Sequence, residues 1–185
     1  MTNNYILRRL RYTFDFNDKN MIAIWALADE VVNREQISAW LKQEDDPGYQ
    51  NCNDRQMAVF LNGLINKFRG KKDGPQMAPE SRINNNIILR KLKIALNLID
   101  DDILTIMASV EMEMGKSELS AFFRKAGHKH YRKLQDQMLR RFLQGVEMKY
   151  KKVEVKGAIK DAPKSSDKPA VEESVNNGVW KTPKS

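Results

Sequence analysis

Apolar residues near the start of the chain recur every three or four positions, which is the spacing of one face of an α-helix. The clearest stripe, Ile6, Leu7, Leu10 and Phe14, predicts a helix over about residues 4–16. The same spacing predicts three further helices, over about 18–29, from about 34 and from about 54. The pattern therefore predicts an all-α fold.

Polar residues at the beginnings of these stripes are typical helix N-caps. Asn33 is followed three positions later by Gln36, which is the spacing of a capping box. Asn17 or Asp18, and Asn53, precede two of the other stripes. The Pro47-Gly48 pair between the third and fourth stripes predicts a turn.

The whole pattern returns after 82 residues. Residues 3–65 align with 85–147 without a gap, and sixteen of the 63 aligned positions are identical. A repeat of this length predicts two tandem homologous four-helix units, packed through their apolar faces as a pseudo-symmetric pair. Gly63 and Gly145 fall at matching places inside helices, where glycine costs about 1 kcal/mol relative to alanine. We therefore expect a close helix–helix approach at both glycines.

The repeat divides the chain into a first unit (1–70), a linker (71–82), a second unit (83–150) and a tail (151–185). The linker is rich in Gly, Pro and Lys. The tail has few large apolar residues, so we expect it to be disordered, because it cannot offset its ordering entropy. Trp180 could anchor a short docking motif, although a lone tryptophan in such a tail more often has no partner.

The net charge is +8, and it is unevenly distributed. Residues 1–70 are neutral, so the basic excess lies in the second unit and the tail. Such an excess permits contact with nucleic acid or another polyanion. The single cysteine, Cys52, excludes an internal disulfide, and no apolar run approaches the roughly 18 residues that span a bilayer. We expect a cytoplasmic protein that does not enter a membrane.

Five aligned positions are basic in both units. They supply the candidate nucleic-acid contacts Arg8, Arg11, Arg90, Lys91, Lys93, Lys116 and Arg124. Two arginines three apart on a helix face can grip neighbouring phosphates, and Arg90, Lys91 and Lys93 are expected on the outward side of their helix. The alternative is a solvated helix surface with ion pairs such as Arg11 with Asp15. The set as a whole does not decide between the two.

Residues 27–41 also resemble a helix-turn-helix motif, whose second helix enters the major groove. Its outward residues would be Arg34, Glu35, Ser38 and Ala39. The usual glycine of the turn is absent, with Val31 in its place, and one arginine beside one glutamate reads bases poorly. Two helices packed within an α-domain are the better interpretation.

A metal site is a weaker candidate. Asp45 and Asp46 lie in the loop of the first unit, and His128 and His130 lie in the matching loop of the second. If the loops met, these side chains could bind a transition metal. Isolated titratable residues in polar loops are usually solvated, and no catalytic motif is present. The sequence gives no reason to name a cofactor or a reaction.

Three sequence segments are similar to those of a known family: residues 85–92, residues 40–48, and residues 60–65 together with Arg69-Gly70. They resemble the YehS family of bacterial proteins, which is built of two copies of a domain of unknown function. The resemblance implies a bacterial, cytosolic protein with two helical repeats, and it supplies no site residues. The leading functional hypothesis is a non-enzymatic module that contacts RNA or DNA through basic helix surfaces. The alternative is a protein-interaction adaptor or a homodimer.

Overall fold

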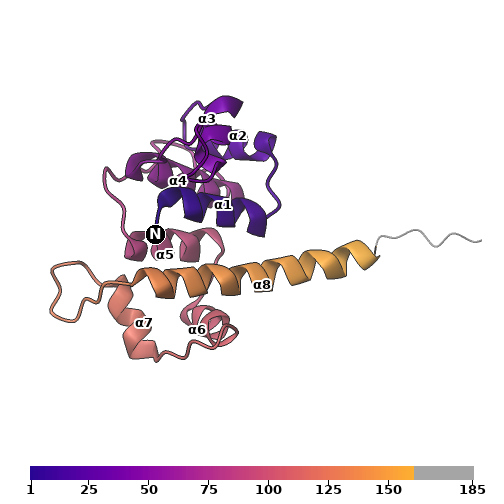
Figure 1. Cartoon of the computed structure of the whole chain (residues 1–185). Helices are drawn as coiled ribbons and strands as arrows, with labels where there is room; N and C mark the ends of the chain where they lie inside the picture. The colour runs from indigo at the N-terminus through magenta and orange to yellow at the C-terminus, as the bar shows by residue number, and fades with distance from the viewer. Residues whose placement is uncertain (161–185) are drawn as a thin grey trace, which may run out of the picture.

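A computed structural model describes residues 1–160 as eight α-helices without a strand (Figure 1). The helices of the first unit are α1 (Asn3–Thr13), α2 (Asp18–Leu27), α3 (Arg34–Leu41) and α4 (Asp54–Arg69). Those of the second are α5 (Asn85–Ala95), α6 (Asp100–Ala108), α7 (Lys116–Phe123) and α8 (Asp136–Lys160). The predicted all-α fold of two four-helix repeats is confirmed. None of the described helices is both long and apolar enough to cross a membrane.

The predicted N-caps of the first unit are present. Asn17, Asn33 and Asn53 each cap a helix and each form a capping box with the residue three positions later. The paired asparagines at the start of α1 and α5 have another role, because Thr2 and Asn84 are the caps there. In the second unit the aligned cap positions have no capping side chain, since Ile99 and Gly115 occupy them before α6 and α7.

The two units pack as a pseudo-symmetric pair around one core. Helix α1 packs against α8, and its counterpart α5 packs against α4, so that α5 lies between the two halves in Figure 1. Polar contacts also connect the start of each unit to the last helix of the other unit. The amide of Ile83, which precedes α5, donates to Asp54 of the first unit, whereas the amino group of Met1 contacts Asp136 of the second. One continuous cluster of buried apolar residues runs through both units.

The linker is fixed to the first unit by side chains of α4. Asn62 donates to the carbonyl oxygen of Met77 at 3.1 Å, and Asn66 donates to the Gln76 side chain at 2.9 Å. These hydrogen bonds hold the linker beside the interface of the two units.

Helix α8 continues ten residues beyond position 150, where the second unit was expected to end. Extending an existing helix requires much less free energy than nucleating a new one. The part of α8 that packs in the second unit can therefore continue as a helix into the Lys-rich sequence that follows. The rest of the predicted tail, with Trp180, lies outside the described residues.

Two buried asparagines position the loops after the third helix of each unit. The Nδ2 group of Asn4 donates to the carbonyl oxygens of Trp40 (2.9 Å) and Gln50 (2.7 Å), and its Oδ1 accepts from the amide of Cys52 (2.9 Å). Asn86 makes the aligned set in the second unit, to Phe122 (2.9 Å), Arg132 (2.8 Å) and Leu134 (3.0 Å). Each asparagine therefore clamps both ends of its loop to the first helix of its unit.

Candidate functional site

Most of the basic positions shared by the two units have structural partners. Arg8 donates to the carbonyl oxygen of Lys42 at 2.7 Å, and Arg90 donates to that of Phe123 at 2.6 Å. Both guanidinium groups satisfy carbonyl groups left open at the end of a helix, α3 or α7. This role explains why the two arginines occur at the same place in both units.

Ion pairs account for the next two shared positions. Arg11 pairs with Asp18 at 3.0 Å, rather than with Asp15 as expected, and Lys93 pairs with the aligned Asp100. Arg34 also contacts Asp18, and Lys116 pairs with Asp101 at 2.8 Å. The hydrogen bond to the Asp101 carboxylate raises the pKa of Lys116 above its usual value. Lys116 remains largely exposed, so it can still contact a ligand.

The position of Lys91 differs from the one expected from the sequence. It was placed on the outward side of α5, but its side chain is buried between the units, with only 3% of its surface exposed. Its ammonium group lies 2.5 Å from Oδ1 of Asn62 and 2.9 Å from the carboxylate of Glu80. The pseudo-twofold packing turns this face of α5 toward α4. Lys91 is therefore a structural residue and cannot reach a nucleic acid.

The last shared pair, Lys42 and Arg124, differs between the units. Lys42 is tied to Asp46 at 2.8 Å, which lowers the pKa of the aspartate. The residue aligned with Asp46 is His128, so Arg124 has lost this partner. Among the side chains that the structure describes, those of residues 1–151, no ion pair involves Arg124.

Each unit has an open hollow at the same place, between its third helix and the loop that follows. In the first unit it measures about 480 Å³ and includes Arg34, Lys42 and Gly48. In the second it measures about 470 Å³; we call it the basic hollow, and its lining is Ser117, Glu118, Ala121, Arg124, Lys129, His130, Tyr131 and Arg132. The two units thus share this hollow, but the charged residues around it differ.

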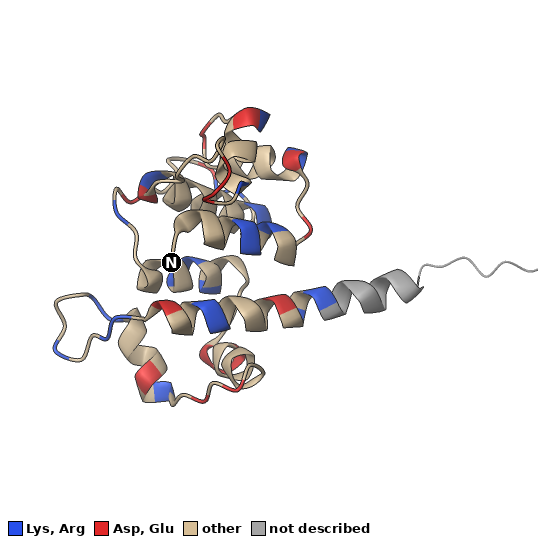
Figure 2. Ribbon diagram, viewed as in Figure 1, with Lys and Arg blue, Asp and Glu red and all other residues tan. Residues whose placement is uncertain are grey.

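The change of charge is large. The loop segment 42–53 carries one lysine and three carboxylates, whereas the aligned segment 124–135, the basic loop, carries five Lys or Arg residues and no carboxylate. Figure 2 shows this loop projecting from the molecule, with blue basic residues among uncharged ones and no red acidic residue. Sequence reasoning missed Lys125, Lys129, Arg132 and Lys133, because it looked for basic residues that the units share. The signal that marks them is a difference between aligned segments.

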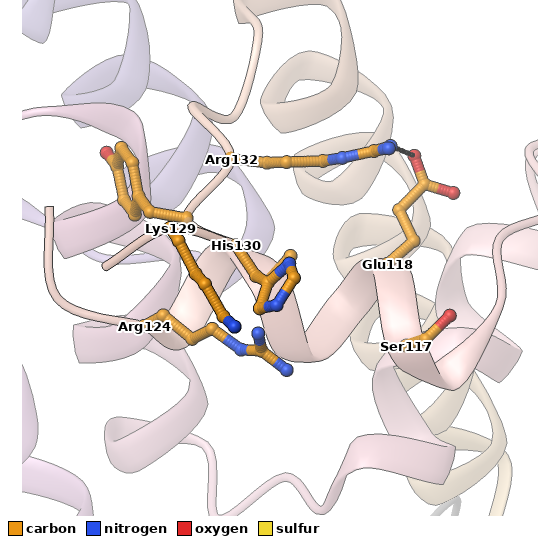
Figure 3. A pocket seen from close by; sticks show the side chains of 8 residues that line it. Ser117, Glu118, Arg124, Lys129, His130 and Arg132 are labelled. Carbon is orange, nitrogen blue, oxygen red and sulfur yellow. Dashed lines mark ion pairs between the residues drawn. The ribbon is translucent and has the colours of Figure 1, made fainter. Parts of the chain in front are cut away.

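The side chains that line the basic hollow converge from two elements. Arg124 and Lys129 reach the same space as the ring of His130, whereas the hydroxyl of Ser117, on α7, points away from these three side chains (Figure 3). Arg132 leans across to Glu118, but the two are 3.8 Å apart, and the Arg132 side chain is 67% exposed. Since an exposed pair at this distance contributes little, Arg132 stays available to a ligand. The hollow can therefore accept an anion of the size of a phosphate group.

The proposed metal ligands do not come together. Asp46 is held by Lys42, and His128 accepts a hydrogen bond from the amide of His130 at 3.1 Å. Among the described residues, no group of three or more His, Cys, Asp or Glu side chains is placed to hold a metal ion. The weaker alternative, in which Asp45, Asp46, His128 and His130 gather at a metal ion, is therefore not supported in this part of the chain.

The segment that resembles a helix-turn-helix consists of α2 and α3. Arg34, Glu35 and Ser38 are exposed there, as that motif requires. Arg34 contacts Asp18 and stays exposed, and the other charged group on the outward face of α3 is the carboxylate of Glu35. This face offers no good contact to bases.

Cys52, near the end of the loop segment 42–53, is buried. Burial, assisted by the nearby Asp54, raises the pKa of its thiol to about 12. At pH 8 only about one thiol in ten thousand is then ionised, and the thiolate is the reactive form. We predict that a disulfide reagent such as Ellman's will not modify the native protein and will modify one thiol after unfolding in guanidinium. Rapid modification of the native protein would contradict this placement.

Comparison with known proteins agrees with the repeat. The model of a family described as "Protein of unknown function (DUF1456)" matches residues 3–70 and again 85–152. The chain is 44% identical over 147 residues to the uncharacterized protein YehS of Escherichia coli strain K12, covering 79% of this chain and 94% of that protein. No solved structure matches. With both copies matched and the helices of each in the same order, the chain belongs to the DUF1456 family.

Proposed function

We propose that the protein is a non-enzymatic module that binds nucleic acid through the phosphate backbone, with the basic loop and the basic hollow as its contact surface. The observation that carries the proposal is the charge difference between two otherwise equivalent loops. The first unit acts as an internal reference for what the scaffold needs. Structural needs do not account for Lys125, Lys129 and Lys133, since the aligned residues of the first unit are Gln43, Pro47 and Asn51. Arg124 is basic like its counterpart Lys42, but His128 stands where Lys42 has its partner Asp46.

The contacts favour backbone recognition over base reading. Lysine and arginine side chains on an exposed loop neutralise phosphates, and such contacts carry no sequence information. Of the residues named from sequence, Lys116 and Arg124 border this surface, whereas Arg8, Arg11, Arg90 and Lys93 support the fold. A protein-interaction adaptor has less support, because the exposed large apolar residues are spread over α1, α4, α5 and the segments between helices.

The proposal predicts salt-dependent affinity for single-stranded RNA or DNA. If about four phosphates are contacted, a plot of log affinity against log salt should have a slope of about −3. Fluorescence anisotropy with a labelled oligonucleotide at several salt concentrations measures this slope. Replacing both Lys125 and Lys133 with glutamate should weaken binding at least about tenfold, because two phosphate contacts become repulsive.

The matched control is the double variant Lys19→Glu and Lys72→Glu. Both lysines are exposed and lie outside the basic loop, and the net charge changes by the same amount. This variant should bind like the native protein. Undetectable binding, or an equal loss in both double variants, would refute a specific basic interface.

A further inference from the structure

The basic hollow differs in shape from the rest of the proposed interface. A backbone that runs across a surface presents singly charged phosphates one after another, and separate exposed cations such as Lys125 and Lys133 can each contact one of them. In the hollow, by contrast, the ends of Arg124, Lys129 and His130 converge on one space (Figure 3). Convergent donors suit a single group with several oxygens and more than one charge.

A phosphate monoester is such a group. It has three terminal oxygens and a charge of about −1.5 to −2 at neutral pH. A guanidinium group can hold two of these oxygens in a bidentate pair, and an ammonium group supplies a compact second charge. Arg124 and Lys129 offer these two donors, and the ring of His130 adds a hydrogen-bonding group. The hollow of about 470 Å³ admits the group with part of its nucleotide.

We infer that the basic hollow binds the terminal phosphate monoester of a nucleic-acid strand, while Lys125 and Lys133 contact the backbone behind it. This inference rests on the proposed function and specifies where on the strand the protein binds. The corresponding hollow of the first unit serves as the comparison. There Lys42 is occupied by Asp46, and Pro47 and Gly48 stand where the second unit has Lys129 and His130.

The test compares three labelled oligonucleotides of one sequence, with a 5′-phosphate, with a 3′-phosphate, and with hydroxyl groups at both ends. We expect one phosphorylated strand to bind at least about tenfold more tightly than the hydroxyl-ended strand, and its identity gives the polarity. The double variant Arg124→Gln and Lys129→Gln should remove this preference. The control Lys42→Gln, in the first unit, should keep it.

The outcomes separate this inference from the proposed function. Equal affinity for all three strands would overturn the terminal-phosphate site and leave backbone binding intact. No binding of any strand would overturn both. A preference that survives in the Arg124→Gln and Lys129→Gln variant would place the phosphate elsewhere and overturn the assignment of the hollow. Circular dichroism of each variant verifies that it remains folded.

Discussion

Replacing Gly63 with leucine should destabilise the protein by about 3 kcal/mol or more, because α4 crosses α2 without room for a side chain at this point. A Cβ atom at Gly63 would overlap the carbonyl oxygen of Ile24. A backbone oxygen within a helix cannot move aside as the end of a flexible side chain can. The expected loss corresponds to a fall in melting temperature of about 6–12 °C, measurable by circular dichroism.

The second unit offers a matched pair of comparisons. At Gly145 an added Cβ would lie 2.5 Å from the carbonyl oxygen of Ile106, so leucine there should also destabilise the protein. At Gly127, in the basic loop, nothing lies within 4 Å, and leucine should leave the melting temperature nearly unchanged. If the Gly63→Leu variant had the same melting temperature as the Gly127→Leu variant, the close approach of α4 and α2 would be disproved.

The features that sequence predicted well are local ones. The spacing of apolar residues located the helices, and the N-cap candidates Asn17, Asn33 and Asn53 gave the starts of three of them, because both signals depend on residues three or four positions apart. The internal repeat predicted the pseudo-symmetric architecture. The paired glycines indicated where helices approach closely, since a side chain is excluded at both aligned places.

The features that sequence missed depend on contacts between units. The burial of Lys91 follows from the packing of α5 on α4, and its partner Glu80 comes from the linker, which has no aligned counterpart. Its counterpart Arg9 shows the same interface from the other side, where it pairs with Glu147 at 2.7 Å. Helical periodicity shows that a residue lies on a given face, but it does not show what covers that face.

The candidate site shows how a duplicated protein should be interpreted. Residues identical in both units, such as Arg8 and Arg90, serve the scaffold that both units share. Four of the five basic residues of the basic loop were overlooked because the aligned residues of the first unit are not basic. In a tandem repeat with one neutral and one charged copy, the aligned differences are the better guide to a binding surface.

The second large effect is expected at the asparagines that clamp the loops. Changing Asn4 to aspartate keeps the size of the side chain but removes the NH2 group that donates to the carbonyl oxygens of Trp40 and Gln50. The buried carbonyl oxygen of Trp40 and the partly buried one of Gln50 then lose their donor and face a carboxylate. Each unsatisfied buried group costs about 1–3 kcal/mol, so the variant should lose roughly 3 kcal/mol or more in its free energy of unfolding. Asn51→Asp, at an exposed position of the same loop, is the control and should melt like the native protein.

Asn86→Asp should be as destabilising as Asn4→Asp, because Asn86 makes the aligned hydrogen bonds to Phe122 and Arg132. The two variants should differ in binding. Only Asn86 fixes the basic loop, through the backbone of Arg132 and Leu134, so only its variant should lose affinity for oligonucleotides at a temperature where both remain folded. Equal affinity in the two variants would show that the position of the basic loop does not matter for binding, whereas a melting temperature unchanged in either would show that the clamp does not support the fold.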